Sequence, residues 1–233
     1  MKRIIAIEHV LGEDLGTFQK TLDRLRIPAL RVWPVDGDGS EWPELSASDG
    51  LIVLGGYMSV HEVDRYPWIQ AEVEFIRRAQ ARGAAILGVC LGMQLLAKSL
   101  GAKVFPMPRA EIGMISVQKT AHGLRHPLLA DLPNPFWAFS WHGEQIELPL
   151  GCQALAGSAD CPIQAIACGV RSIGLQFHLE ADRSWLKRVL GHPQYARDLP
   201  PGAAAGLKRD LEAYEAQLEQ AADRLLSRWV ELA

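Results

Sequence analysis

The sequence predicts an α/β protein with a mostly parallel central sheet that is covered by helices on both faces. In the first half, short apolar runs alternate with amphipathic stretches of helical length. Strands that are apolar at every position are typical of a parallel sheet buried on both faces. In the second half, strand-like segments follow closely between turns, which predicts additional antiparallel strands. The expected architecture is a three-layer sandwich with extra antiparallel strands and a C-terminal helix.

Strand and helix signals alternate along the first half. Pro67 and Gly83 bracket one helical pattern, in the order expected for the first turn and the end of a helix. The connection 35–50 is rich in Gly, Asp and Ser, which predicts turns. We expect strands at 3–7, 29–33, 51–54 and 84–89, and helices at 15–27, at 66–83 and after Cys90.

The second half changes character after the third helix. Strand-like segments are expected near 103–106, 113–120, 136–141, 152–159, 163–169 and 172–178. A short helix is expected at 184–191, and Pro193 with 198–202 marks a boundary. The apolar stripe of a last helix, at 207–232, favours packing on the body over a dimer seam.

Composition excludes several classes of protein. The 233 residues include 24 Lys+Arg and 27 Asp+Glu, with a net charge of -3 and no basic stretch, so nucleic acid is not an expected partner. The apolar run IIAI near the N-terminus is too short for a signal peptide, and no run approaches the ~18 residues of a membrane span. We therefore expect a soluble, cytoplasmic protein that does not bind a membrane.

Four cysteines occur, at positions 90, 152, 161 and 168. They form no C-x-x-C pair and no histidines cluster near them, so we expect no metal site and no cofactor. Disulfides are not expected in a reducing compartment, and Cys152, Cys161 and Cys168 are interpreted as small buried residues.

Cys90 differs because of the sequence around it, 88-GVCLGMQ-94. Strand-Gly-x-Cys-x-Gly-helix is the cysteine form of a nucleophile elbow, in which a tight turn exposes the central side chain above the sheet. The N-terminus of the following helix would favour the thiolate. The alternative is a buried cysteine beside helix-packing glycines.

A nucleophilic cysteine needs a base, and 174-GLQFHLE-180 offers one. On a strand His178 and Glu180 would point to the same side, and a carboxylate beside an imidazole supports its protonated form. The alternative is an edge strand with two solvated polar residues. Together with the elbow, the pattern favours a Cys90–His178–Glu180 triad.

An oxyanion hole is the third part that acyl transfer requires. We expect one donor at the backbone N–H of Leu91, directly after the nucleophile. The second donor is expected from Gly55-Gly56, where the strand LIVL ends. Taken alone, this Gly-Gly pair would be an ordinary turn at the end of a strand.

These motifs resemble the class I (triad-type) glutamine amidotransferases. The chain is most similar to free-standing relatives of the GMP synthetase amidotransferase domain, over about 50–180. The segments that carry the resemblance are DGLIVLGG, YPWI, ILGVCLGMQLLAKSLGAKV, WHGE and GLQFHLE. It implies a flavodoxin-like amidotransferase domain at 1–195, with the helix at 203–233 packed on the same domain.

The resemblance also implies a mechanism and a set of site residues. Cys90 would attack the side-chain amide of glutamine to form a γ-glutamyl thioester, with His178 as acid and base and Glu180 orienting it. The backbones of Gly56 and Leu91 would bind the oxyanion. The remaining residues implied to contact the substrate are Gly55, Gln94, His142 and Gly143.

The chain departs from the family pattern at three places. His178-Leu179-Glu180 replaces H-P-E, which keeps both triad members. Gly55-Gly56-Tyr57 replaces G-G-P, which can reposition the oxyanion loop or cap the pocket. Trp141-His142-Gly143-Glu144 replaces S-H-G-D, which bears on substrate preference, and Trp141 is equally a core residue or a pocket wall.

The segment after Glu180 bears on where the ammonia goes. About 50 residues follow it, too few for an ATP-pyrophosphatase domain, and no P-loop motif occurs in the sequence. We therefore expect ammonia release without activation of an acceptor, so synthesis would need a separate synthetase partner. Two alternatives remain: a γ-glutamyl peptide or conjugate hydrolase with the same triad, and a non-catalytic partner-binding homologue.

The other polar residues rank lower as site candidates. His122 and His126 indicate a turn more than a metal site, because no carboxylates accompany them. His9, His61 and His192 are expected in loops, and Glu8 is expected at the solvated surface.

Overall fold

A computed structural model describes residues 1–34 and 42–232, so part of the predicted 35–50 connection lies outside the described residues. Five strands of its sheet are parallel: β1 (Ile4–Ile7), β2 (Ala29–Val32), β3 (Gly50–Val53), β4 (Ala85–Val89) and β9 (Ser172–Leu175). The residues of β1, β3, β4 and β9 are all buried, which fits their uninterrupted apolar sequences.

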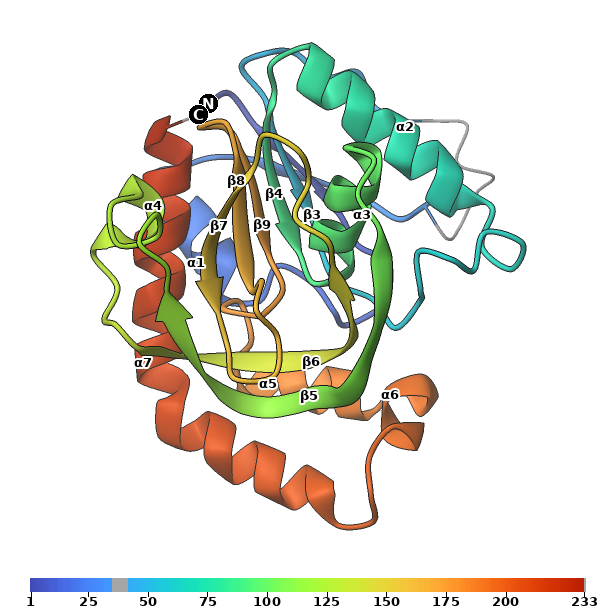
Figure 1. Cartoon of the computed structure of the whole chain (residues 1–233), viewed down its shortest axis with the longest axis vertical. Coiled ribbons are helices and arrows are strands. Elements are labelled where there is room, and N and C mark those ends of the chain that lie inside the picture. Colours follow the sequence, from blue (N-terminus) through green and yellow to red (C-terminus); the bar gives the residue numbers. More distant parts are fainter. Residues whose placement is uncertain (35–41, 233) are drawn as a thin grey trace.

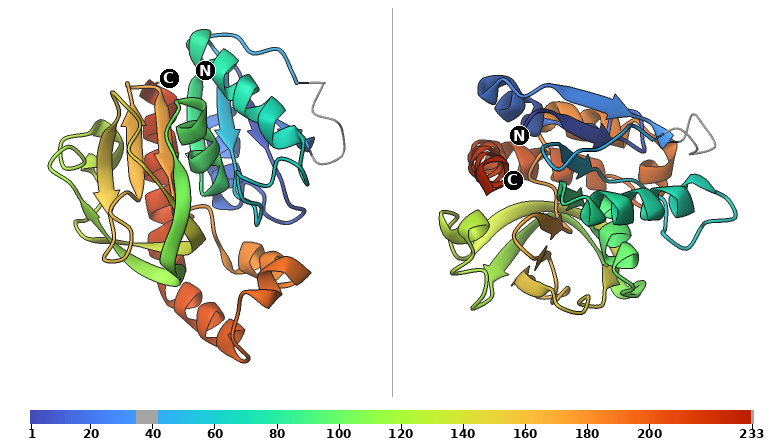
Figure 2. Two further views of the ribbon diagram at one scale, coloured as in Figure 1. Left: turned by 45° about the vertical axis from the view of Figure 1, so that its right-hand side comes forward. Right: turned by 90° about the horizontal axis from the view of Figure 1, so that it is seen from above.

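Helices cover this parallel region on both sides. Figure 2 shows α2 (Trp68–Ala81) and α3 (Leu91–Ser99) on one side, and α1 (Thr17–Leu25) and α7 (Ala203–Leu232) on the other. The prediction of a mostly parallel sheet between two helical layers is confirmed.

The second half adds antiparallel strands to the same sheet (Figure 1). They are β5 (Val104–Lys119), β6 (Phe136–Ile146), β7 (Gln153–Gly157) and β8 (Ala165–Cys168). The strand order is β2-β1-β3-β4-β9-β8-β7-β5-β6. Two segments expected as separate strands, near 103–106 and 113–120, are both parts of β5, which bulges between Pro106 and Glu111. The bulge inserts unpaired residues, and this hid the continuity of the strand from the sequence pattern.

Three short helices and one long helix complete the described chain. The short ones are α4 (Pro127–Ala130), α5 (Arg183–Leu190) and α6 (Pro193–Arg197). The long helix α7 contacts α1, α4 and α5 as well as β5 and β6. Leu211, Leu218 and Trp229 of its apolar stripe are fully buried, so these residues pack on the body. No described helix combines the length and apolarity needed to cross a membrane.

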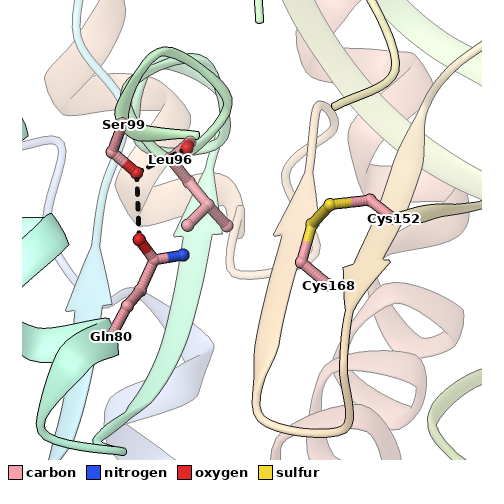
Figure 3. Close-up of a disulfide and its surroundings, with 5 residues drawn as sticks. All are labelled: Gln80, Leu96, Ser99, Cys152 and Cys168. Carbon is pink, nitrogen blue, oxygen red and sulfur yellow. Dashed lines mark hydrogen bonds between the residues drawn. A yellow bond between two sulfur atoms is a disulfide. The ribbon is translucent and has the colours of Figure 1, made fainter. Parts of the chain in front are cut away.

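The prediction that Cys152 and Cys168 are unpaired is wrong. Figure 3 shows a disulfide between them, with their Cα atoms 4.3 Å apart. The antiparallel pairing of Gln153 with Ala167 brings the two cysteines together across β7 and β8. No local sequence pattern indicated this pairing, because it depends on the register of two strands. Cys161 is a free buried thiol, as expected.

Candidate active site

Cys90 lies in a strained turn at the carboxyl end of β4. Its φ of 52° and ψ of -109° are rare for a residue with a side chain. The turn is held by a 2.7 Å hydrogen bond from the Cys90 N–H to the Leu175 carbonyl on β9. Backbone strain of this kind persists where surrounding structure enforces it, and it is common at functional sites. The predicted elbow conformation is therefore present.

Gly88 and Gly92 allow the strand and the helix to cross at this turn. A Cβ on Gly88 would lie 2.5 Å from the carbonyl oxygen of Gly92. A Cβ on Gly92 would collide with the carbonyl oxygen of Val53, on the neighbouring strand β3. Both obstacles are backbone atoms that cannot move aside cheaply, so the spacing G-x-C-x-G is a packing requirement.

The Cys90 side chain is buried but reaches a cavity. Its exposed fraction is 5%, and its thiol donates a 3.7 Å hydrogen bond to the carbonyl of Trp141. Cys90 is also the residue that precedes α3, so the positive end of that helix dipole faces its surroundings.

His178 and Glu180 form a buried pair beside the elbow. The Nδ1–H of His178 donates a 2.6 Å hydrogen bond to Oε1 of Glu180, and both side chains are essentially inaccessible. The prediction that both residues belong to a regular strand is wrong, because β9 ends at Leu175. His178 is instead placed by an isolated bridge to Phe139, whose carbonyl accepts the His178 N–H at 2.7 Å.

The surroundings of His178 favour its protonated form. Burial alone would lower the pKa of the imidazole, but Glu180 and a hydrogen bond with Cys90 raise that pKa well above its ordinary value. An imidazolium whose pKa is high stabilises a neighbouring thiolate. The three residues named as a triad are thus brought together beside the elbow.

The two expected oxyanion donors, Gly56 and Leu91, lie against each other beside Cys90. Leu91 is the first residue of α3, where backbone N–H groups have no partner inside the helix. Gly56 lies against it, since a Cβ on Gly56 would be 2.9 Å from Cδ2 of Leu91. Within the described ranges, the Gly56 N–H donates no hydrogen bond to another protein group.

A cavity of about 270 Å³ opens above the thiol. Gln94, His142 and Gly143, the residues expected to contact substrate, line it, and Gly56 does too. Their contact with substrate stays a prediction. Gly55 lies behind this wall, buried against Glu13 and His178. The lining as a whole comprises Gly56, Tyr57, Met58, Ser59, Glu62, Cys90, Gln94, Trp141, His142, Gly143, Glu144, Tyr195 and Asp198.

His142 belongs to a buried polar cluster that could in principle hold a metal. Ligand atoms of Glu111, His142 and Cys161 lie within 4.8 Å of one another. However, burial raises the pKa of the Cys161 thiol to about 11, and its Sγ donates to the Ile163 carbonyl. Glu111 is already bonded to His142 at 3.1 Å and to Gln164 at 2.6 Å. These contacts fit a network that orients His142 better than they fit a metal centre.

Two residues beside the site were missed by the sequence analysis. Tyr195, on α6, lines the cavity and donates a hydrogen bond from its hydroxyl to the buried carboxyl of Glu13. Burial and this carboxylate raise the pKa of Tyr195 well above its usual range. Its ring packs edge-on against Trp141 and Tyr57. The only signal in the sequence was Pro193, which starts the short helix that carries Tyr195.

The expectation for Glu8 is wrong, whereas His9, His61 and His192 lie outside helices and strands as expected. Glu8 is not solvated but buried, with an ion pair of 3.4 Å to Arg31. His9 is also buried and is paired with Glu72 on α2. The periodicity of the sequence did not show that helix α2 covers the end of β1. His192 stacks on Tyr57 beside the cavity.

The chain resembles known proteins in sequence and in structure. Residues 20–189 match the model of a family described as glutamine amidotransferase class I. The chain is 40% identical over 190 residues to a GMP synthase from Thermomicrobium roseum, which covers 79% of this chain and 34% of that protein. It is 33% identical over 155 residues to the glutamine amidotransferase-like protein YfeJ of Salmonella typhimurium, covering 65% of each. The chain therefore spans about a third of the length of the GMP synthase.

Two solved structures agree over almost the whole chain. A glutamine amidotransferase from Thermotoga maritima superposes with a TM-score of 0.88 at 29% identity, covering 99% of this chain and 98% of that one. A second, from Methylobacillus flagellatus, gives a TM-score of 0.86 at 27% identity and covers 100% and 95%. Both cover α6 and α7, which lie beyond residue 189.

Proposed function

The chain belongs to the class I glutamine amidotransferase family, and from that premise we propose that it hydrolyses the side-chain amide of glutamine to glutamate and ammonia. The observation that carries the proposal is the strained Cys90 turn beside the buried His178–Glu180 pair. A cysteine at such a turn with a carboxylate-supported imidazole is the arrangement that nucleophilic catalysis requires.

The proposed reaction begins with the Cys90 thiolate attacking the γ-carbonyl carbon. The carbonyl electrons move to oxygen, which accepts hydrogen bonds from the N–H groups of Gly56 and Leu91. His178 then donates its proton to the amide nitrogen, the C–N bond breaks and ammonia leaves. The product of this half-reaction is a γ-glutamyl thioester on Cys90.

Water completes the cycle. Neutral His178 removes a proton from the water as the oxygen attacks the thioester carbon. The C–S bond breaks, releasing glutamate and restoring the thiolate and imidazolium. Throughout, Glu180 accepts a hydrogen bond from Nδ1, so that Nε2 faces the reacting atoms.

The cavity supplies groups suited to the amino-acid end of glutamine. Glu62, Glu144 and Asp198 line it, and such carboxylates attract an α-ammonium group. Gln94 and the His142–Gly143 segment would provide hydrogen bonds, while Gly55 allows the loop to lie close to His178. We propose that ammonia leaves for a separate synthetase when it serves synthesis.

The decisive experiment measures glutamate release from glutamine. The wild type should show it, and Cys90→Ala should lower kcat by roughly 10⁴-fold or more. Cys161→Ala is the matched control, because Cys161 is a free buried thiol outside the proposed triad. Mass spectrometry of quenched reactions should show a γ-glutamyl adduct on Cys90. Equal activity of Cys90→Ala and wild type would refute the assigned nucleophile.

A second candidate substrate is a γ-glutamyl peptide or conjugate. It is favoured by the cavity wall of Tyr57, Trp141 and Tyr195, which offers apolar surface beyond what an ammonia leaving group uses. Comparing kcat/KM for glutamine with that for γ-glutamyl dipeptides decides between the two. A clear preference for glutamine would count against the conjugate.

The remaining alternative is a non-catalytic homologue that binds a partner. The juxtaposition of Cys90, His178 and Glu180 argues against it. Failure of Cys90 to react with a glutamine-analogue electrophile would support it.

A further inference from the structure

A second buried histidine–carboxylate pair lies behind the oxyanion loop and has no part in the mechanism above. His9 follows β1, and its side chain and that of Glu72 on α2 are both fully inaccessible. Nε2 of His9 lies 3.1 and 3.0 Å from the two carboxylate oxygens of Glu72. Nδ1 of His9 lies 3.0 Å from the carbonyl oxygen of Gly55.

The partners of His9 determine its protonation. A carbonyl oxygen can only accept a hydrogen bond, so Nδ1 carries a proton. When Glu72 is ionised, its carboxylate oxygens can also only accept, so Nε2 then carries the second proton and His9 is an imidazolium. Burial lowers its pKa, but Glu72, the Gly55 carbonyl and Glu13 together raise it.

Peptide geometry connects His9 to the oxyanion hole. The carbonyl of Gly55 and the N–H of Gly56 belong to one trans peptide group, so they point in opposite directions in one plane. A donor that fixes the Gly55 carbonyl on the His9 side therefore fixes the Gly56 N–H on the other side. That side is the cavity, which Gly56 lines together with Cys90.

Helix α2 holds the imidazole in place. Trp68 and Glu72 are one turn apart on α2, so both face His9. The Trp68 ring stacks on the imidazole, with centroids 5.1 Å apart and planes inclined by 19°. Without glycine at position 56 the arrangement would be crowded, because a Cβ there would lie 3.2 Å from Cβ of His9.

We propose that His9 and Glu72 are positioning residues that orient and polarise the Gly55–Gly56 peptide as an oxyanion donor. A cationic donor on the carbonyl side pulls electron density along the peptide and strengthens its N–H as a donor. The inference rests on the proposed acyl transfer at Cys90, but not on glutamine as the substrate.

The alternative is that the pair only stabilises the fold. The two roles predict different kinetics, because an oxyanion donor acts mainly in the transition state. Loss of positioning lowers kcat while KM for glutamine stays constant. A purely structural pair lowers the fraction of folded enzyme, so activity per folded molecule is preserved.

The test compares three variants with wild type. His9→Leu removes the donor to Gly55, and kcat for glutamine should fall roughly 10- to 10³-fold with KM unchanged within about twofold. His9→Asn keeps an N–H donor near the Nδ1 position and should recover much of the loss. Glu72→Gln keeps the shape of the side chain but removes the charge, and should give an intermediate kcat.

Two further probes isolate the oxyanion hole from glutamine recognition. Acylation of Cys90 by 4-nitrophenyl acetate passes through an oxyanion, so nitrophenolate release should slow in His9→Leu as kcat does. Alkylation of Cys90 by iodoacetamide forms no oxyanion, and its rate should not change. Cys90→Ala provides the background for both reactions.

The results distinguish the positioning role from a purely structural role of the pair. If alkylation and acylation slow together, or if neither slows, the positioning role is overturned. If all three variants lose their fold, the pair is a fold determinant and the proposal is equally overturned. If wild type acylates Cys90 with the expected His9 dependence but does not hydrolyse glutamine, the proposed function fails and the positioning role stands.

Discussion

The two sides of the cavity above Cys90 are built in different ways. The chemical side consists of strand ends and the start of α3, with Cys90, His178 and Glu180 at most 5% exposed. The recognition side consists of Tyr57, Glu62 and Asp198, on loops and at the end of α6, together with Glu144 near the end of β6. Those residues are half-buried or exposed.

This contrast separates reaction type from substrate choice. The groups proposed to move protons and electrons are fixed by backbone bonds, such as those from Cys90 to Leu175 and from His178 to Phe139. The proposed recognition groups are fixed by side-chain contacts, such as that from Ser59 Oγ to Glu144 Oε1 at 2.8 Å. Substitutions on the first side should change kcat, and those on the second should change KM.

After removal of the proposed nucleophile itself, the largest expected effect is on the chemical side, for Glu180→Gln. This change keeps the side-chain shape but removes the charge that raises the pKa of His178. We expect kcat to fall roughly 10²- to 10⁴-fold. In wild type the raised pKa keeps His178 protonated above its ordinary pH range, and activity declines only when pH rises past that pKa.

The pH profile tests the cause of this loss. The alkaline limb of kcat/KM, measured between about pH 5 and pH 10, should move to lower pH in Glu180→Gln. Glu147→Gln is a control, since Glu147 is exposed and does not line the cavity. An alkaline limb at the same pH in both variants would mean that Glu180 does not set the pKa of His178.

The next effect concerns the support of the elbow, in Gly92→Ala. The added Cβ collides with the Val53 carbonyl, so α3 must shift relative to β3. We expect kcat to fall on the order of 10²-fold and the free energy of unfolding to fall by about 3 kcal/mol. Gly206→Ala on α7 is the matched control, because a Cβ there meets no atom within 4 Å. Wild-type kcat in a folded Gly92→Ala protein would contradict the packing argument.

The Cys152–Cys168 disulfide should affect the stability of the protein but not its activity. Cys168 pairs with Ser172, which pairs with Ile86 near the start of β4, whereas Cys90 follows the other end of β4. Cys152→Ser with Cys168→Ser should therefore lower the free energy of unfolding by about 3 kcal/mol through loss of a 16-residue loop closure. Denaturant unfolding checks the loss, and kcat should be unchanged. A fall in kcat without a fall in stability would disprove the separation.

The smallest effect is expected on the recognition side, for Glu144→Gln. Removing one carboxylate from the cavity wall should raise KM for glutamine about 3- to 10-fold with kcat unchanged within about twofold. Steady-state kinetics of this variant and of Glu147→Gln provide the comparison. If kcat falls instead, Glu144 acts on the chemical side. The proposed division into residues that change kcat and residues that change KM would then be wrong.

The sequence predicted the chemical side better than the recognition side. The elbow depends on close backbone approaches at Gly88 and Gly92 and on the positive φ of Cys90. These three residues lie within five positions, so a short motif indicates the turn. His178 and Glu180 were paired correctly although the strand ends at Leu175, because their side chains, two positions apart, still meet. The elbow and the His178–Glu180 pair could therefore be predicted from short sequence segments alone.

Three features that depend on contacts between distant segments were not predicted. Tyr195 reaches the cavity only because α6 folds back over Tyr57 and Trp141. His9 and Glu72 meet across 63 positions, and nothing near either residue marks the other. The Cys152–Cys168 disulfide likewise follows from the register of β7 and β8.

Helix α6 lies in the chain between α5 and α7. Those two helices are joined by ion pairs from Arg183 to Glu212 at 2.9 Å and to Glu215 at 2.8 Å. The segment 191–202 can therefore be grafted from a relative while its two anchors stay in place. Because Tyr195 and Asp198 of this segment line the cavity, we expect such chimaeras to change which amides bind and to leave the proposed triad in place.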